Sequence, residues 1–186
     1  MNPQRPPPRL DLLAFARSAG VLSGSDLLSN YERLMQETKG LGPENALIWS
    51  ARGEWLTHPP GGPQVWLHLK ANAELALTCQ RCLGLAALNV DVMRSFRFCA
   101  TEEQAQAEDA QADEDLLVLC DDFNLAELIE DEMLLALPLV PRHRVCPVPV
   151  RMALADPDFE TALLERRQPF TVLEKFKIGG SSNRQS

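Results

Sequence analysis

The chain has 186 residues, of which 45% are apolar, and a formal net charge of −8 at pH 7. This length and composition suit one domain with a real hydrophobic core, and no apolar run approaches the ~20 residues that span a bilayer. Prolines interrupt the N-terminal sequence MNPQRPPPRL, so we expect no secretory h-region in it. We therefore expect a cytoplasmic protein that does not enter a membrane. The five cysteines form no small-secreted-domain pattern, which favours reduced thiols or metal ligands over disulfides.

The negative charge is concentrated in one stretch of the chain. Residues 102–132 contain 13 acidic residues and no Lys or Arg, which leaves 18 basic and 13 acidic residues elsewhere. A mildly basic body beside one acidic stretch is compatible with RNA contact. Many enzymes have comparably uneven surfaces, so charge alone does not decide between RNA contact and an ordinary solvated surface.

The first part of the chain predicts a proline-rich lead and two helices. Residues 1–9 are expected to be disordered. Apolar residues at helical spacing indicate a short helix within residues 10–19. A second helix is expected to begin at Ser25, which is a suitable N-cap, and to end near Gly40.

Apolar residues at alternate positions predict three strands next. The strands cover residues 45–56, 65–78 and 88–98, and a proline turn over residues 58–63 joins the first two. Strands joined by short turns form an antiparallel meander. Arg94 lies on the apolar parity of the third strand, which suggests a β-bulge near this residue.

The segment TEEQAQAEDAQADED, residues 101–115, is interpreted as a mobile acidic loop because it offers no apolar stripe to bury. Residues 116–120 are a candidate fourth strand. These elements predict an α+β fold in which an antiparallel β-meander packs with a few helices. We expect a single domain over residues 10–177 and a flexible tail over residues 178–186.

The sequence NLAELIEDEMLLAL predicts the longest helix, over residues 124–137. Asn124 is its N-cap, and Glu127 three positions later completes a capping box. Apolar residues at helical spacing face the core, whereas Glu130 is expected to face solvent. Pro138 ends the helix.

Two pairs of soft ligands share the same spacing. Cys79 and Cys82 are the ends of CQRC at the predicted hairpin tip, and His143 and Cys146 are the ends of HRVC after the long helix. Four such ligands from two segments suit a tetrahedral structural zinc site. The alternative is two unrelated surface turns with reduced cysteines. A redox role for CQRC is weaker, because a thioredoxin-like motif needs its first cysteine at a helix N-terminus.

Arginines near these pairs form the remaining candidate surface. If the two pairs converge, Arg81, Arg142 and Arg144 converge with them, and the predicted hairpin also carries Arg94 and Arg97. A cationic cluster of this kind suits the phosphate groups of RNA. The alternative is ordinary surface charge.

Three blocks of sequence occur in a characteristic order: LTCQRCL, then LAELIEDEMLLALPLVPRH with Cys146, then PFTVLEKFK. Their order and spacing resemble the bacterial YceD family, the large ribosomal RNA subunit accumulation proteins, over most of residues 11–177. The resemblance implies a non-enzymatic role in the synthesis, processing or stability of large-subunit ribosomal RNA. Some relatives have a complete second cysteine pair where this chain has His143 and Cys146, and histidine is a legitimate replacement ligand.

We therefore expect a non-catalytic ribosome biogenesis factor. It would bind precursor large-subunit ribosomal RNA, or a pre-ribosomal particle, through the CQRC hairpin and the neighbouring arginines. The acidic loop would then be free to mimic RNA or to recruit a basic ribosomal protein.

Two alternatives stay open. One is a protein-interaction adaptor in which the acidic segment is the functional part, and the other is a thiol or zinc enzyme. The sequence contains no phosphate loop, nucleophile elbow or dinucleotide fingerprint. Neither His58 nor His68 has a Ser or Cys partner in a motif.

Overall fold

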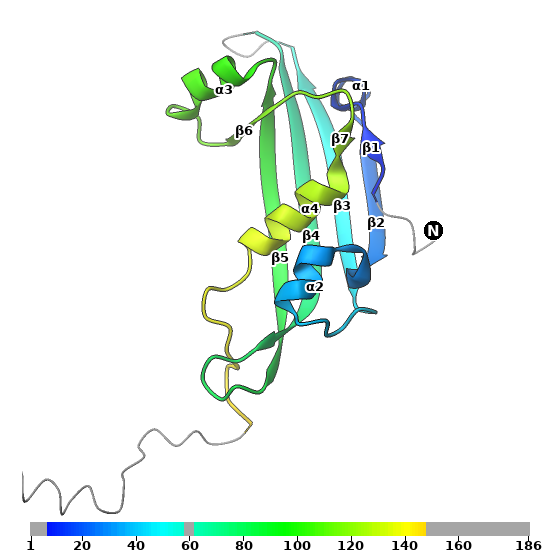
Figure 1. Cartoon of the computed structure of the whole chain (residues 1–186). Helices are drawn as coiled ribbons and strands as arrows, with labels where there is room; N and C mark the ends of the chain where they lie inside the picture. The colour runs from blue at the N-terminus through cyan, green and yellow to red at the C-terminus, as the bar shows by residue number, and fades with distance from the viewer. Residues whose placement is uncertain (1–6, 58–61, 148–186) are drawn as a thin grey trace, which may run out of the picture. The chain divides into compact units, whose positions relative to one another are not determined.

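The computed structural model describes residues 7–57 and 62–147 (Figure 1), and the statements below concern these residues. They all belong to one unit of the chain, Met1–Pro149. The predicted domain over residues 10–177 and the predicted tail over residues 178–186 extend beyond them and stay predictions. Within the described ranges, no helix is long and apolar enough to cross a membrane.

Five strands form the main sheet, in the order β2-β3-β4-β5-β6. The four antiparallel members are β2 (Val21–Leu27), β3 (Ala46–Leu56), β4 (Gln64–Thr78) and β5 (Leu85–Cys99). The short strand β6 (Asp115–Val118) adds to β5 in parallel. The predicted α+β fold on an antiparallel meander is therefore confirmed, with one parallel strand added at its edge.

The helical segments are α1 (Leu12–Arg17), the 3-10 turn η1 (Leu28–Asn30), α2 (Glu32–Glu37), α3 (Glu102–Asp109) and α4 (Leu125–Leu135). Of these, α1, α2 and α4 pack on one face of the sheet, whereas α3 lies beside the end of β5 (Figure 1). A second, two-stranded sheet pairs β1 (Arg9–Leu10) with β7 (Phe123–Asn124). The predicted disordered lead therefore does not extend to Arg9.

The core lies between the sheet and helices α1, α2 and α4. Every second side chain of β4, from Val65 to Leu77, is buried and faces these helices, whereas Lys70 and Glu74 on the other face are exposed. The helices contribute apolar side chains such as Ile129, which is fully buried. One covered face and one solvated face explain why alternation alone located this strand.

Strand β2 covers the first part of the helix that the sequence predicted, so the predicted start at Ser25 is wrong, whereas η1 and α2 lie in the later part of that prediction. The inward side of β2 carries Gly24 and Asp26 in place of apolar residues. The Trp49 ring occupies the space beside Gly24, where an added Cβ would lie 2.7 Å from a ring carbon. The buried Asp26 carboxylate accepts hydrogen bonds from Trp49 Nε1 at 2.7 Å and from the Tyr31 hydroxyl at 2.9 Å. Burial and the neighbouring Asp26 raise the pKa of Tyr31.

Helix α3 forms within the acidic segment, so the prediction of an unstructured loop over residues 101–115 is wrong for this part. Thr101 caps the helix. Arg97 holds the segment on the sheet, with Nη1 2.5 Å from Glu108 and Nε 2.5 Å from Glu114. These ion pairs take the place of the apolar stripe that the segment lacks.

Arg94 lies on the helix-covered face without a bulge. The pairing of β4 with β5 is continuous from Val65↔Phe98 to Thr78↔Leu85, so the predicted bulge is wrong. Arg94 instead forms ion pairs with Asp115 and, at 3.4 Å, with Glu132 of α4. The ion pairs of Arg94 on the inner face therefore explain why the apolar pattern of β5 is interrupted there.

Helix α4 begins as predicted, because Asn124 Oδ1 accepts a hydrogen bond from the Glu127 backbone N–H at 3.3 Å. Glu130, predicted to face solvent, instead contacts α2. Its Oε1 accepts hydrogen bonds from the backbone N–H groups of Arg33 and Leu34, at 2.7 and 3.2 Å. Glu130 thus caps α2, which has no side-chain cap from its own N-cap residue.

Candidate metal centre

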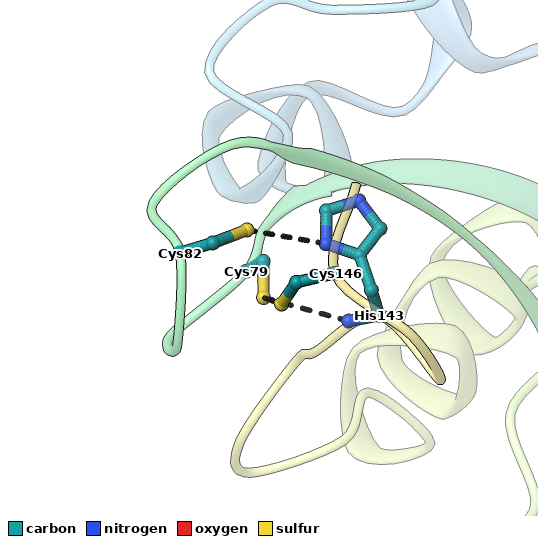
Figure 2. Close-up of side chains that lie close together, drawn as sticks. All are labelled: Cys79, Cys82, His143 and Cys146. Carbon is teal, nitrogen blue, oxygen red and sulfur yellow. Dashed lines mark hydrogen bonds between the residues drawn. The ribbon is translucent and has the colours of Figure 1, made fainter. Parts of the chain in front are cut away.

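The turn between β4 and β5 carries the first pair of candidate ligands. Cys79 directly follows β4, and Cys82 lies in the turn before β5. The Cys79 N–H donates to the Gly84 carbonyl and the Leu83 N–H donates to the Cys79 carbonyl, both at 2.8 Å. Leu83 adopts a left-handed conformation, with φ of 60°. This tight turn directs both thiols toward one centre (Figure 2).

The segment after α4 brings the second pair to the same centre. His143 Nδ1 lies 3.3 Å from Cys82 Sγ, and the Sγ atoms of Cys79 and Cys146 are 3.9 Å apart. All four ligand atoms lie within 4.8 Å of one another (Figure 2). The structure therefore brings together the four residues that the sequence selected.

These separations fit a tetrahedral zinc ion. Bond lengths of ~2.3 Å to sulfur and ~2.0 Å to nitrogen place two sulfurs roughly 3.8 Å apart, and a sulfur and a nitrogen roughly 3.5 Å apart. The second nitrogen of His143, Nε2, lies 2.7 Å from the Leu85 carbonyl oxygen. Such a contact orients the imidazole of a metal-binding histidine. Donor set, spacing and outer contact therefore fit a structural zinc ion.

Donors surround the thiols and stabilise negative charge on sulfur. Burial alone would raise the pKa of the Cys79 thiol. Hydrogen bonds from the backbone N–H groups of Cys82, His143 and Arg81 outweigh this effect and lower the pKa to about 5. Arg81 Nε also donates to Cys146 Sγ at 3.0 Å, and its Nη2 donates to the His143 carbonyl at 3.2 Å. Zinc bound to three thiolates and a neutral histidine carries one net negative charge, which the Arg81 guanidinium would balance.

The five arginines selected as RNA ligands fall into two groups. Arg81, Arg142 and Arg144 are exposed and lie at or next to the candidate ligands. Arg94 and Arg97 are each paired with carboxylates. Arg94 lies nine residues beyond the start of β5, which is roughly 30 Å along the strand at ~3.4 Å per residue. The structure therefore places only the first three near the candidate metal centre.

The segments that build this centre contain no acidic residue. Residues 75–90 and 133–147, here called the tip, contain neither Asp nor Glu but include the three exposed arginines. Large apolar side chains are also exposed there, among them Leu83 at 76%, Leu139 at 101% and Val145 at 81%. The tip is thus a cationic and partly apolar surface on a chain of net charge −8.

Sequence reasoning missed the polar partners that strand register creates. His68 Nδ1 lies 2.8 Å from Ser95 Oγ, and its Nε2 lies 2.8 Å from Glu54 Oε2. The three residues belong to adjacent strands, so only the pairing of the sheet could have revealed this contact. We interpret the trio as a hydrogen-bond chain that links the three strands. The Leu85 carbonyl and the Arg81 contacts at the metal centre likewise left no signal in the spacing.

A family model described as large ribosomal RNA subunit accumulation protein YceD matches residues 67–177. The matched span includes all four candidate ligands and the whole of α4. Comparisons with the curated proteins and with the solved structures found no match. Because the match covers more than half of the 186 residues, the chain belongs to the YceD family of large ribosomal RNA subunit accumulation proteins, whose role lies in ribosome biogenesis.

Proposed function

We propose that the protein is a non-catalytic assembly factor that binds the precursor of large-subunit ribosomal RNA through its tip. One observation carries this proposal: the tip has three exposed arginines and no carboxylate, although the chain as a whole is acidic. Guanidinium groups bind phosphate oxygens through paired N–H donors. No carboxylate of the tip competes for the guanidinium groups of Arg142 and Arg144, which suits them to RNA phosphates, whereas Arg81 already donates to Cys146 and His143.

A structural zinc ion would position the arginines of the tip. Arg142 and Arg144 flank His143 in a segment without helix or strand, so a metal bond to His143 would restrict both side chains at once. Cys79, Cys82, His143 and Cys146 would fill all four positions of a tetrahedral ion. A filled site leaves no position for a reacting water, which is the arrangement of structural rather than catalytic zinc. This arrangement supports the proposal of a non-catalytic role.

The acidic segment lies at the other end of β5 from the tip (Figure 1). Its carboxylates form ion pairs with both arginines of this end: Glu108 and Glu114 pair with Arg97. Asp115 pairs with Arg94. RNA contact at these two arginines stays a prediction and would require the carboxylates to leave. Negative potential at this end favours an approach of RNA at the tip.

Crosslinking in growing cells, followed by sequencing of the attached RNA, tests the proposal. We expect wild-type reads to concentrate in a few segments of large-subunit ribosomal RNA. The double variant Arg142→Ala/Arg144→Ala should lose most of these reads, since it removes two phosphate ligands. The matched control is Arg52→Ala, because Arg52 is an exposed arginine on the sheet, 3.0 Å from Glu54, and its loss should leave the reads unchanged.

A binding titration with purified protein gives the second measurement. Each lost phosphate contact should reduce the slope of log K against log salt concentration by about 0.7–0.9. Background-level crosslinking of the wild type, beside a known RNA binder that crosslinks well, would reject direct binding. Deletion of residues 102–114 would then test the adaptor hypothesis, in which the acidic segment recruits a basic ribosomal protein.

A further inference from the structure

Among residues 7–57 and 62–147, the outer edge of β2 has no strand beside it. Within these described residues, β2 is hydrogen-bonded to β3 alone. Just outside its two ends, the Gly53 N–H donates to the Gly20 carbonyl and the Leu28 N–H donates to the Asn45 carbonyl, both at 2.9 Å. Even-numbered residues of β2 therefore bond to β3, because bonding directions alternate along an antiparallel strand. The backbone N–H and C=O groups that point away from β3 belong to Val21, Ser23, Ser25 and Leu27.

The sequence of β2 lacks most of the features that usually block a strand edge, and the exception is the inward-pointing charge of Asp26. VLSGSDL contains no Lys, Arg or Pro, and its pairing with β3 runs without a bulge. Its single charge, Asp26, is 1% exposed, whereas Val21 is 66% exposed. The opposite edge of the sheet carries Asp91, Arg94 and Asp115. Protein edges are commonly protected by charges, prolines or bulges, so the neutral edge of β2 is suited to accept a strand.

This edge is also held in a fixed position. The Asp26 carboxylate is hydrogen-bonded to Tyr31 and Trp49, and the Trp49 ring packs directly on Gly24. Two of the three inward positions of β2 are thus tied to the core. A strand that is already ordered loses little conformational entropy when it acquires a partner.

We propose that β2 pairs antiparallel with β2 of a second copy of this chain. A two-fold axis at Gly24 pairs Val21 with Leu27 of the second copy, and Ser23 with Ser25 of the second copy. This register uses every outward backbone group of both strands, and it places each exposed Val21 beside a leucine. No charges meet across the axis, because Asp26 points into the core.

The side chains that meet in this register favour a second copy, because Val21 lies beside Leu27 of the second copy and no charges face each other. An isologous contact places the same surface on both partners, and VLSGSDL satisfies its own outward groups when it is paired with itself. The two sheets would then join into one continuous sheet. Because β2 precedes the span of residues 67–177 that matches the family model, this pairing does not follow from family membership.

Sedimentation equilibrium of the full chain tests the pairing. The chain mass is 20.7 kDa, and we expect a reversible shift to twice this mass as the concentration rises to about 100 μM. Ser23→Pro removes an outward N–H without breaking the ladder to β3, and Ser25→Lys places a charge on the edge. Both variants should stay monomeric at 100 μM, whereas Ser23→Thr, which keeps the N–H, should dimerise like the wild type.

Circular dichroism and the urea midpoint identify variants that fail to fold. A wild-type chain that stays monomeric at about 100 μM overturns the proposal. A dimer that persists in both folded variants, Ser23→Pro and Ser25→Lys, also overturns it, because the interface then lies on another surface.

Discussion

Glu130 is expected to contribute much of the stability of the contact between α4 and α2. Its side chain is 12% exposed, and its two oxygens accept hydrogen bonds from two backbone N–H groups of α2 and from Arg33 Nε. Glu130→Ala removes the acceptor for all three donors. Glu130→Gln keeps one oxygen for the backbone N–H groups, but it removes the charge and replaces the acceptor of Arg33 Nε with an amide NH2. It is therefore the matched comparison for the capping contacts.

The structure sets the size of both effects. Loss of a helix cap costs about 1 kcal/mol, and an unpaired N–H at the fully buried Leu34 adds about 1 kcal/mol. The ion pair with Arg33, whose side chain is 45% exposed, adds roughly 0.5 kcal/mol after solvent screening. Glu130→Ala should therefore lower the free energy of unfolding by about 2–3 kcal/mol, and Glu130→Gln by less than about 1 kcal/mol.

Urea unfolding measures the difference, with the fluorescence of the three tryptophans as the signal. For a slope of about 2 kcal/mol per M, the midpoint should fall by about 1–1.5 M in Glu130→Ala and by less than about 0.5 M in Glu130→Gln. Equal shifts in the two variants would show that charge, not capping, dominates. A shift below about 0.3 M in Glu130→Ala would refute the view that this side chain holds α2 in place.

Two further predictions concern the metal centre and a buried carboxyl group. Cys82→Ser should reduce the zinc content of the purified protein, measured by atomic emission, from about one ion per chain to near zero. The control Cys120→Ser, at an exposed cysteine outside the cluster, should retain the ion. Equal zinc in the two variants would contradict the site. Burial raises the pKa of Glu132 above its ordinary value of 4.5, so the native state holds this proton more tightly than the unfolded state, and stability is lost as pH rises from 4.5 through the raised native pKa. Glu132→Gln should remove this loss, so the difference in unfolding free energy between wild type and variant should change as the pH rises above 4.5. A difference that stays constant over this rise refutes the assignment.

The strands β3, β4 and β5 and the metal ligands were predictable because short-range patterns specify them. In β4, alternation alone distinguishes the covered face from the solvated one, since every second residue from Val65 to Leu77 is apolar. The spacing of CQRC and of HRVC allows each pair to point at one centre. The two pairs form one cluster because the β4–β5 turn and the segment after α4 lie side by side.

The errors occur where a distant side chain decides the local structure. The inward side of β2 carries Gly24 and Asp26, because Trp49 from the next strand fills the space and donates a hydrogen bond. Helix α3 has no apolar stripe, and it is held by Arg97 from the sheet. Glu130 has the sequence context of a solvent-facing residue, but its partners lie about one hundred positions earlier. Neither hydrophobic periodicity nor a capping rule can predict these partners, because both use only residues that are close in the sequence.

The pairing of β1 with β7 has a consequence for the order of folding during synthesis. It joins the two ends of the described fold, and Arg9 bonds to Asp122 across a separation of 113 residues. At about 5–20 residues per second, Leu10 leaves the ribosome roughly 6–23 s before Phe123. The strands β2 to β6 acquire all their neighbours from one another during this interval, while β1 has none. The N-terminal strand is therefore the last part of this sheet system to close, at a time determined by the rate of translation.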